Sequence, residues 1–366
     1  MGRIRAFISN EKNHKLLIPI IAVILGFLLG NIIMLLTGAN PMALYKSLIQ
    51  AVAGVNVDNI GTDKTVFTVR KVGEYFVYVM PIVLTGLSVA FAFRTGLFNI
   101  GAEGQLLMGA FAATFIGINL DLPKLILIPI IALGGALLGG FWGFIPGYLK
   151  AKFNVHEVVV TIMLNYAALH ITNYAMKQIP GSDSVKTVKL HENALLGSEF
   201  LKDLTSNSRF NYGFIIVLIA VFVFWFVINK TNFGYELKAV GFNPFAAEYA
   251  GMKVKRNAAL SMGIAGAFSG LAGVIIVTGT FGYGRVLTSF ENYGFDGIAV
   301  ALIGGTTAIG TLLSGFLLGA LKAAQPIMQG QGVPKDITII ITASIIVFVA
   351  MQKAISAILK KAKGAK

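Results

Sequence analysis

The sequence contains no cysteine among its 366 residues, so disulfide bonds and cysteine-ligated metal sites are excluded. It has no G-x-x-x-x-G-K-[ST] motif, which excludes nucleotide hydrolysis at a P-loop. Its histidines and acidic residues show no metal-site spacing, and no Ser/His/Asp arrangement stands out. We therefore expect a chain that is not an enzyme and that binds no cofactor itself.

Charged residues are also scarce. They make up 13% of the chain, whereas soluble domains have about a quarter, and 56% of the residues are hydrophobic. The mean hydropathy is +0.77, and many segments reach the ~20 apolar residues that cross a bilayer. The 42 glycines favour close helix–helix packing within a membrane. These features predict an all-α, polytopic membrane bundle that forms a single domain over residues 1–366.

About ten membrane crossings can be placed along the chain. Residues 16–36 are too long for the apolar part of a signal peptide and are predicted to be a retained first span. Near the C-terminus, Gly304-Gly305-Thr306-Thr307 interrupts an apolar run and divides it into two shorter pieces. The predicted spans are 16–36, 72–93, 97–118, 125–149, 158–177, 211–229, 257–279, 293–304, 311–325 and 336–352.

The net charge of +14 could suggest a nucleic-acid partner, but the cationic residues lie at the ends of apolar spans. This is the distribution that orients membrane proteins, so nucleic acid is set aside and the lipid bilayer is the expected surrounding. The pattern places the loop 230–256 and the basic tail 353–366 in the cytoplasm. The segments 37–70 and 178–210 are then external, and Asn40-Pro41 is expected to begin an amphipathic helix in the first of them. The N-terminal cations that support this orientation are Arg3, Arg5, Lys12 and Lys15.

Two glycine-rich segments, 94–105 and 291–297, place polar residues inside otherwise apolar regions. Each has an aromatic residue beside Asn or Asp before an apolar helix, which suggests two related halves. Broken helices line transport paths, and polar residues at membrane depth usually mark function. The alternative for Asn99 and Asp296 is that they cap helix starts. Glu103 and Gln105 lie within a helical pattern, where a role in the path or between helices is favoured.

The predicted span 158–177 has one polar face, because Thr161, Asn165, Ala168 and Thr172 recur at helical spacing. The preceding Asn154-Val-His-Glu157 matches a capping box, so we interpret His156 and Glu157 as end-capping residues. The predicted path residues are Phe98, Asn99, Glu103, Gln105, Thr161, Asn165 and Asp296.

Residues 243–251 predict a helix of about two turns within the basic loop. Asn243 is a suitable N-cap, Pro244 fits the first helical position, and Gly251 can adopt the left-handed conformation that ends a helix. Phe245 and Tyr249 share one face and have no evident core to fill. We interpret the helix as an aromatic-faced docking element for another protein; the alternative is a packed interfacial turn. The predicted docking residues are Asn243, Pro244, Phe245, Glu248, Tyr249 and Gly251.

A membrane chain with a cargo path, a cytoplasmic docking helix and no nucleotide site suggests a permease driven by a separate ATPase. The other class considered is a secondary transporter that works alone. Such a protein would need acidic groups buried in its spans, and Glu103 and Asp296 are the only candidates in the sequence.

Four blocks of sequence, 86–105, 155–166, 237–251 and 295–304, strongly resemble permease subunits of bacterial ABC importers of the nucleoside and simple-sugar branch. The resemblance extends over nearly the whole chain. It implies a multi-pass subunit of the cytoplasmic membrane that works with an ATP-binding cassette ATPase, which uses ATP. It also implies a second permease, either homologous or a copy of this chain, and an external substrate-binding lipoprotein. The loop 237–256 would then correspond to the helix that couples the permease to the ATPase.

The block Asn99–Gln105 looks most like the nucleoside branch of this family. Nucleosides are therefore the expected cargo, and ribose-like simple sugars or branched-chain amino acids are the alternatives.

Overall fold

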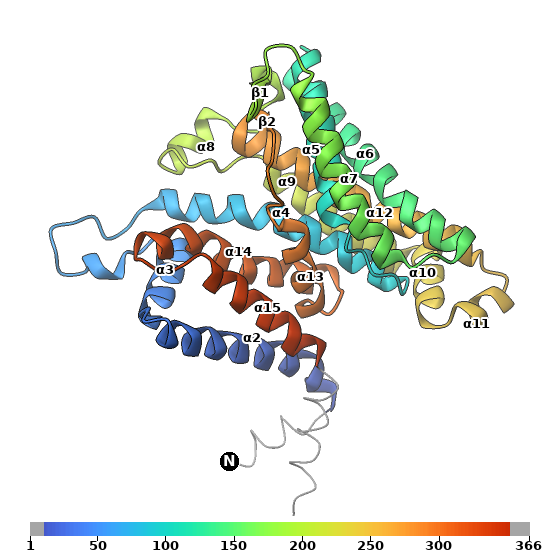
Figure 1. The fold of residues 1–366 in the computed structure, drawn as a ribbon, viewed down its shortest axis with the longest axis horizontal. Coiled ribbons are helices and arrows are strands. Elements are labelled where there is room, and N and C mark those ends of the chain that lie inside the picture. Colours follow the sequence, from blue (N-terminus) through green and yellow to red (C-terminus); the bar gives the residue numbers. More distant parts are fainter. Residues whose placement is uncertain (1–10, 352–366) are drawn as a thin grey trace, which may run out of the picture.

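The computed structural model describes residues 11–351, in which helices dominate (Figure 1). Within residues 11–351, seven helical segments are long and apolar enough to cross a membrane. Arg3, Arg5 and the basic tail 353–366 lie outside the described residues. The helices that form these segments are α2 (Glu11–Leu36), α4 (Val69–Arg94), α6 (Lys124–Phe153), α7 (Glu157–Lys177), α9 (Gly213–Lys230), α12 (Val254–Ile275) with the turn that follows it, and α14 (Ala308–Gly330).

Three further helices correspond to the remaining predicted spans: α5 (Ala102–Asn119), α13 (Tyr293–Ile303) and α15 (Asp336–Ala350). The predicted break at residues 304–307 is confirmed, because α13 ends before it and α14 begins after it. The fold class is thus confirmed as a polytopic helical membrane protein, while the count of ten crossings stays a prediction.

The centre of the bundle is α4, which is buried over most of its length and packs against α12, α13, α14 and α9. The ring of Phe91 on α4 lies 5.6 Å from Phe224 on α9 and 5.8 Å from Phe268 on α12. Such an aromatic cluster buries a large apolar area and joins three helices that are distant in sequence. The aromatic cluster holds α4 between α9 and α12. One face of α4 also meets the site described below.

Close glycine contacts join α5, α6 and α12. A Cβ atom added to Gly270 of α12 would lie 2.2 Å from the carbonyl oxygen of Gly135 of α6. One added to Gly109 of α5 would lie 2.2 Å from the Gly270 carbonyl oxygen. Only glycine permits backbones to approach this closely, which is the usual role of small residues between membrane helices. α12 continues as a π-helical turn, η3 (Ile276–Phe281).

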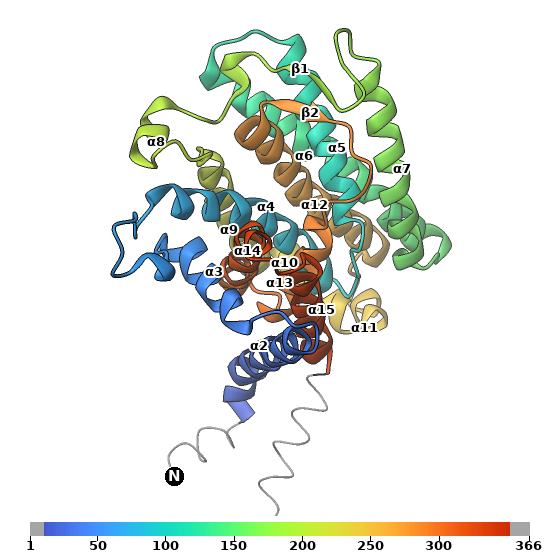
Figure 2. The ribbon, with the colours of Figure 1, turned by 60° about the vertical axis from the view of Figure 1, so that its left-hand side comes forward.

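The N-terminal and C-terminal parts form a second group of helices (Figure 2). α15 packs against α2, where Gly26 and Gly30 accommodate Ile345 and Ile341. The expected amphipathic helix is α3 (Pro41–Ala53), capped by Asn40 and packed against α14.

Short elements that connect the long helices gather at the two ends of the bundle (Figure 1). At one end lie the antiparallel strand pair β1 (Lys186–Lys189) and β2 (Tyr283–Arg285) and the short helix α8 (Glu199–Leu204). At the opposite end lie α10 (Asn232–Phe242) and α11 (Pro244–Tyr249). The sequence analysis predicted neither element: the strand pair joins residues almost 100 positions apart, whereas α10 has a local signal that was missed, the N-cap Thr231, whose hydroxyl accepts from the Gly234 N–H at 3.0 Å. Two single-turn 3-10 helices, η1 (Val57–Asn59) and η2 (Glu192–Ala194), complete the described elements.

The predicted capping box at the start of α7 is wrong. Asn154 instead ends α6 in the left-handed conformation, with φ of 53°. His156 is the N-cap residue of α7 but makes no side-chain capping bond, and Glu157 forms an ion pair with Lys150 at 3.2 Å. Only residues 154–156 lie between the two helices. Asn154 ends α6, so it does not cap α7.

Candidate functional site

The first predicted break, between α4 and α5, is closed by paired amide side chains. The chain leaves α4 at Thr95 and Gly96, whose φ is 75°, and α5 begins only at Ala102. Asn99 is buried there; its Nδ2 donates to Gln105 Oε1 at 2.9 Å, and Gln105 Nε2 donates back to Asn99 Oδ1 at 3.0 Å. Reciprocal bonding satisfies two amides that would be costly at this depth if they were unpaired.

Glu103 joins the first break to the second. Its carboxylate, 1% exposed, accepts backbone N–H bonds from Glu291 at 3.1 Å, Asn292 at 3.0 Å and Gly294 at 2.5 Å. These donors are free because they lie at the start of α13, where the first turn of a helix has no internal acceptors. A Cβ atom on Gly294 would lie 2.3 Å from the backbone nitrogen of Glu103, so glycine is required for this approach. A side chain of α5 therefore caps α13 across the bundle.

Replacing Glu103 by leucine is expected to destabilise the protein strongly, because three backbone donors would lose a charged acceptor. Bonds to charged groups contribute about 1.5–3 kcal/mol each, and the loss of several exceeds what a typical substitution costs. Glu103→Gln, which keeps one acceptor oxygen, should lie between the leucine variant and the native protein. Thermal melting of the purified protein, followed by size-exclusion chromatography, measures this order. Equal melting temperatures for all three proteins would contradict the capping role.

Asn165 attaches α7 to the same region. Its Oδ1 accepts from the Gly104 N–H at 2.8 Å, and its Nδ2 donates to the Ile100 carbonyl at 3.0 Å. Thr161, one turn earlier, donates to backbone carbonyls of its own helix. The predicted polar face of α7 is confirmed as buried: all four residues at helical spacing, Thr161, Asn165, Ala168 and Thr172, turn inward.

Neither Asn99 nor Asp296 is an N-cap residue in the structure, so that alternative is wrong. Asn99 lies two residues before the N-cap Gly101, whose N–H it accepts at 3.1 Å. Asp296 lies in the first turn of α13, after the N-cap Asn292, and its Oδ2 accepts from Lys322 Nζ at 2.8 Å. Of the predicted path residues, Phe98 is half-buried, with its ring 5.0 Å from that of Phe93.

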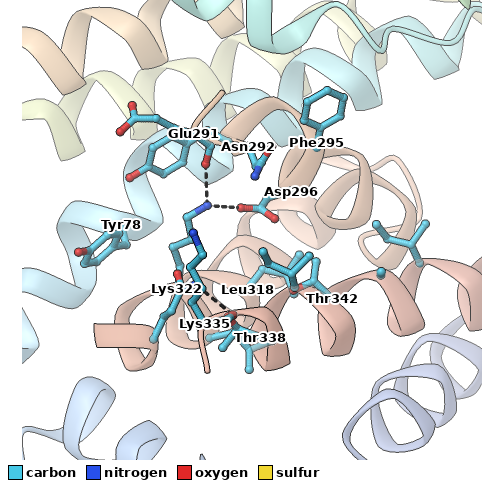
Figure 3. A pocket seen from close by; sticks show the side chains of 16 residues that line it. Tyr78, Glu291, Asn292, Phe295, Asp296, Leu318, Lys322, Lys335, Thr338 and Thr342 are labelled. Atoms are coloured by element: carbon cyan, nitrogen blue, oxygen red, sulfur yellow. Dashed lines mark hydrogen bonds and ion pairs between the residues drawn. The ribbon is translucent and has the colours of Figure 1, made fainter. Parts of the chain in front are cut away.

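Asp296 differs from the other predicted path residues because it lines a cavity of about 490 Å³ (Figure 3). The cavity lies between α4, α13, α14 and α15. Its wall also contains Tyr78, Lys322 and Thr342, which the sequence analysis did not select. A usable signal existed for Lys322 alone, as a single cation inside the apolar helix α14, and such residues commonly mark function.

The structure thus divides the predicted path residues into two sets. Asn99, Glu103, Gln105 and Asn165 form one buried set of side chains that is hydrogen-bonded within the protein. Asp296 faces the neighbouring cavity, which the segment held by Glu103 helps to line. The first set, Asn99, Glu103, Gln105 and Asn165, is called the polar joint below, and the cavity lined by Asp296 lies beside it.

At one end of the bundle, α11 has the predicted form. Asn243 accepts from the N–H groups of Phe245 and Ala246, Pro244 is the first helical residue, and Gly251 follows the helix with φ of 82°. Phe245 is 81% exposed and Tyr249 96% exposed. Neither ring is therefore packed within the described part of the chain, and the docking role of α11 stays a prediction. Glu248 is exposed as well.

Comparison with known proteins agrees with this architecture. Residues 72–351 match a family model described as the branched-chain amino acid transport system permease component. A guanosine ABC transporter permease of Bacillus subtilis is 48% identical over 96% of this chain and 98% of its own length. A nucleoside ABC transporter permease of Lactococcus lactis is 39% identical over 98% and 96%, and a glucose ABC transporter permease of Haloferax volcanii 30% over 81% and 82%.

These matches cover both the polar joint and α11, and they agree with the apolar helices of a multi-pass protein of the cytoplasmic membrane. The chain is a transport subunit, and it belongs to the family of permease components typified by the branched-chain amino acid transport system.

Proposed function

We propose that this chain forms the membrane pathway of an ATP-driven importer of nucleosides. The observation that carries the proposal is its similarity, over almost its entire length, to two permeases named for guanosine and nucleoside transport. The relatives are named as ABC transporter permeases, which does not support the alternative of a secondary transporter that works alone. A simple sugar is the second candidate cargo, because a glucose permease is also similar at 30% identity.

Uptake by cells that express the complete transporter tests the cargo. Radiolabelled guanosine and uridine should accumulate only when the chain is present, and excess unlabelled nucleoside should prevent it. If glucose or ribose accumulates instead, and nucleosides do not compete with it, the cargo is a sugar.

The partners follow from the same proposal. The exposed rings of α11 support docking to an ATP-binding cassette ATPase, which would use ATP while this chain binds no cofactor. A second permease, either homologous or a copy of this chain, would complete the pathway, and an external lipoprotein would deliver the nucleoside. The buried amides between α5 and α7 and the Glu103 carboxylate between α5 and α13 would line the path once the bundle opens, offering hydrogen bonds without rows of like charge.

The proposed orientation places the segments 37–70 and 178–210 outside, and the loop 230–256 and the tail 353–366 inside. The separation of α8 and the strand pair from α11, at opposite ends of the bundle, supports this assignment (Figure 1). It accords with the cationic residues beside α11.

Because the native chain lacks cysteine, single cysteines test the orientation directly. Ser184→Cys, an exposed position before β1, should react with an impermeant maleimide on intact cells. Glu248→Cys on α11 should react only after the membrane is permeabilised. The reverse labelling pattern would show that the orientation is wrong.

A further inference from the structure

The cavity beside the polar joint has the size and wall of a small-molecule site. Its volume of about 490 Å³ lies within the roughly 300–1,000 Å³ of ligand pockets. Apolar side chains of α14 and α15, including Leu318 and Ile339, form one wall. The rings of Tyr78 and Phe295 also line the cavity, on opposite sides in the view of Figure 3. A wall of this kind accepts a ring with apolar faces.

Three of the four charged residues on the wall are in ion pairs, which favours an uncharged ligand beside them. Lys322 is paired with Asp296, and Glu291 is paired with Arg285, whose Nη1 lies 2.7 Å from Glu291 Oε1. Lys335, at the rim, is exposed to solvent. A charged ligand bound at Lys322, Asp296 or Glu291 would have to compete with one of these pairs, whereas an uncharged ligand leaves them intact.

The pair Lys322–Asp296 still has bonding capacity on the cavity side. Asp296 uses Oδ2 for the lysine, and no hydrogen bond to its Oδ1 occurs among residues 11–351. Lys322 donates to Asp296 and to the Glu291 carbonyl at 3.0 Å, which leaves one of its three N–H groups. A carboxylate oxygen without a hydrogen bond and an ammonium group with one remaining N–H lie side by side, and the ammonium nitrogen also lies 4.7 Å from the centre of the Tyr293 ring. Together they match two adjacent hydroxyl groups, one of which donates while the other accepts.

The cavity is held in shape by the carboxylate of Glu103. Asn292 lines the cavity with φ of 67°, a conformation that costs energy for a residue other than glycine. Its N–H is bound by Glu103, as are those of Glu291 and Gly294 on either side. The polar joint therefore fixes the turn that carries Asn292 and leads to Asp296, so the site is preorganised.

We propose that this cavity is a holding site for the nucleoside on its way through the permease. In it, Asp296 accepts a hydrogen bond from the 2′-hydroxyl of the ribose, Lys322 donates one to the adjacent 3′-hydroxyl, and the base lies against the aromatic and aliphatic wall. Glu103 is a positioning residue for this site. The inference rests on the proposed function, because it supplies the place where the same cargo would bind.

The test compares guanosine with 2′-deoxyguanosine, which lacks the adjacent hydroxyl pair, using the complete transporter in proteoliposomes. Asp296→Asn should lower the initial rate of guanosine uptake by about tenfold or more, since a charged hydrogen bond is weakened. The rate for 2′-deoxyguanosine should change by less than about twofold, because its sugar makes little use of the carboxylate. Dividing each variant rate by the native rate for the same ligand cancels the preference of the external binding protein.

A steric variant keeps the test decisive if Asp296→Asn fails to fold. Thr342→Trp places a large ring in the cavity and should reduce uptake of both ligands. Val347→Trp on the exposed face of the same helix is the matched control and should leave both rates near the native values. Equal losses for guanosine and 2′-deoxyguanosine in Asp296→Asn, or native rates in Thr342→Trp, would overturn the holding site. If the native transporter carries sugars and no nucleoside, the proposed function itself is wrong.

Discussion

Truncating Phe245 and Tyr249 together to alanine is expected to abolish ATP-driven uptake. Both rings project from α11 with 81% and 96% of their surface exposed, and α11 is held by its own caps rather than by these rings. Aromatic anchors of an interface often contribute about 2 kcal/mol or more each, which corresponds to a roughly 30-fold loss of affinity per ring. The amount of folded permease should not change, because neither ring packs in the core. Co-purification of the ATPase and uptake of labelled nucleoside measure the two effects.

Phe200→Ala is the matched control for this experiment. Phe200 is 68% exposed on α8, at the end of the bundle opposite α11 (Figure 1). Its loss should leave association with the ATPase at the native level. Normal ATPase association and normal transport with both α11 rings removed would show that α11 is only a structural element.

Introducing a side chain at Gly270 is expected to have the largest effect on stability. Its Cβ would lie 2.2 Å from the carbonyl oxygen of Gly135, a backbone atom that cannot move without separating α12 from α6. Overpacking usually costs about 1–3 kcal/mol and more where backbone must shift, so Gly270→Ala should lower the melting temperature clearly. Gly270→Leu should prevent accumulation of folded protein. Fluorescence-detected size-exclusion chromatography after heating measures both variants.

Gly263→Ala on the same helix provides the matched comparison. Its added Cβ would lie 3.5 Å from the nearest atom, the carbonyl oxygen of Gly140, which is an ordinary contact. The same chemical change should therefore be tolerated two turns away. A similar loss of stability in both alanine variants would mean that helix propensity, rather than the contact between α12 and α6, decides the outcome.

Long helices and their ends were predictable where the signal is local. A helix corresponds to each of the ten predicted spans. Asn40 and Asn243 cap the starts of their helices, and Gly251 follows α11 in the left-handed conformation. Each of these features depends on residues within a few positions of one another, so neighbouring residue types are sufficient to specify it. The capping box before α7 failed for the same reason, because two helices compete for one short turn and a pattern cannot tell which of them uses Asn154.

Contacts between residues that are distant in the sequence could not be predicted in this way. The sequence marks Glu103 and Asn165 as polar residues in apolar surroundings, which is why they were selected. It does not show that Glu103 caps α13, nearly 190 positions away, or that Asn165 binds Gly104. Lys322 was missed because a single lysine in a long helix is also compatible with a surface position, and only its pairing with Asp296 gives it a role.

The sequence by itself determined that this protein is a polytopic helical membrane protein with a capped, aromatic-faced helix in a basic loop. Composition, hydrophobic periodicity and capping are properties of short stretches of sequence. Because the interior of a bilayer contains no water, the backbone forms helices there, in which its hydrogen bonds are made within the segment. Only the tertiary structure decided which buried polar groups meet, which of them remain open to a cavity, and where two backbones touch through glycine. Those contacts join residues far apart in the chain, and their geometry is set by how whole helices pack.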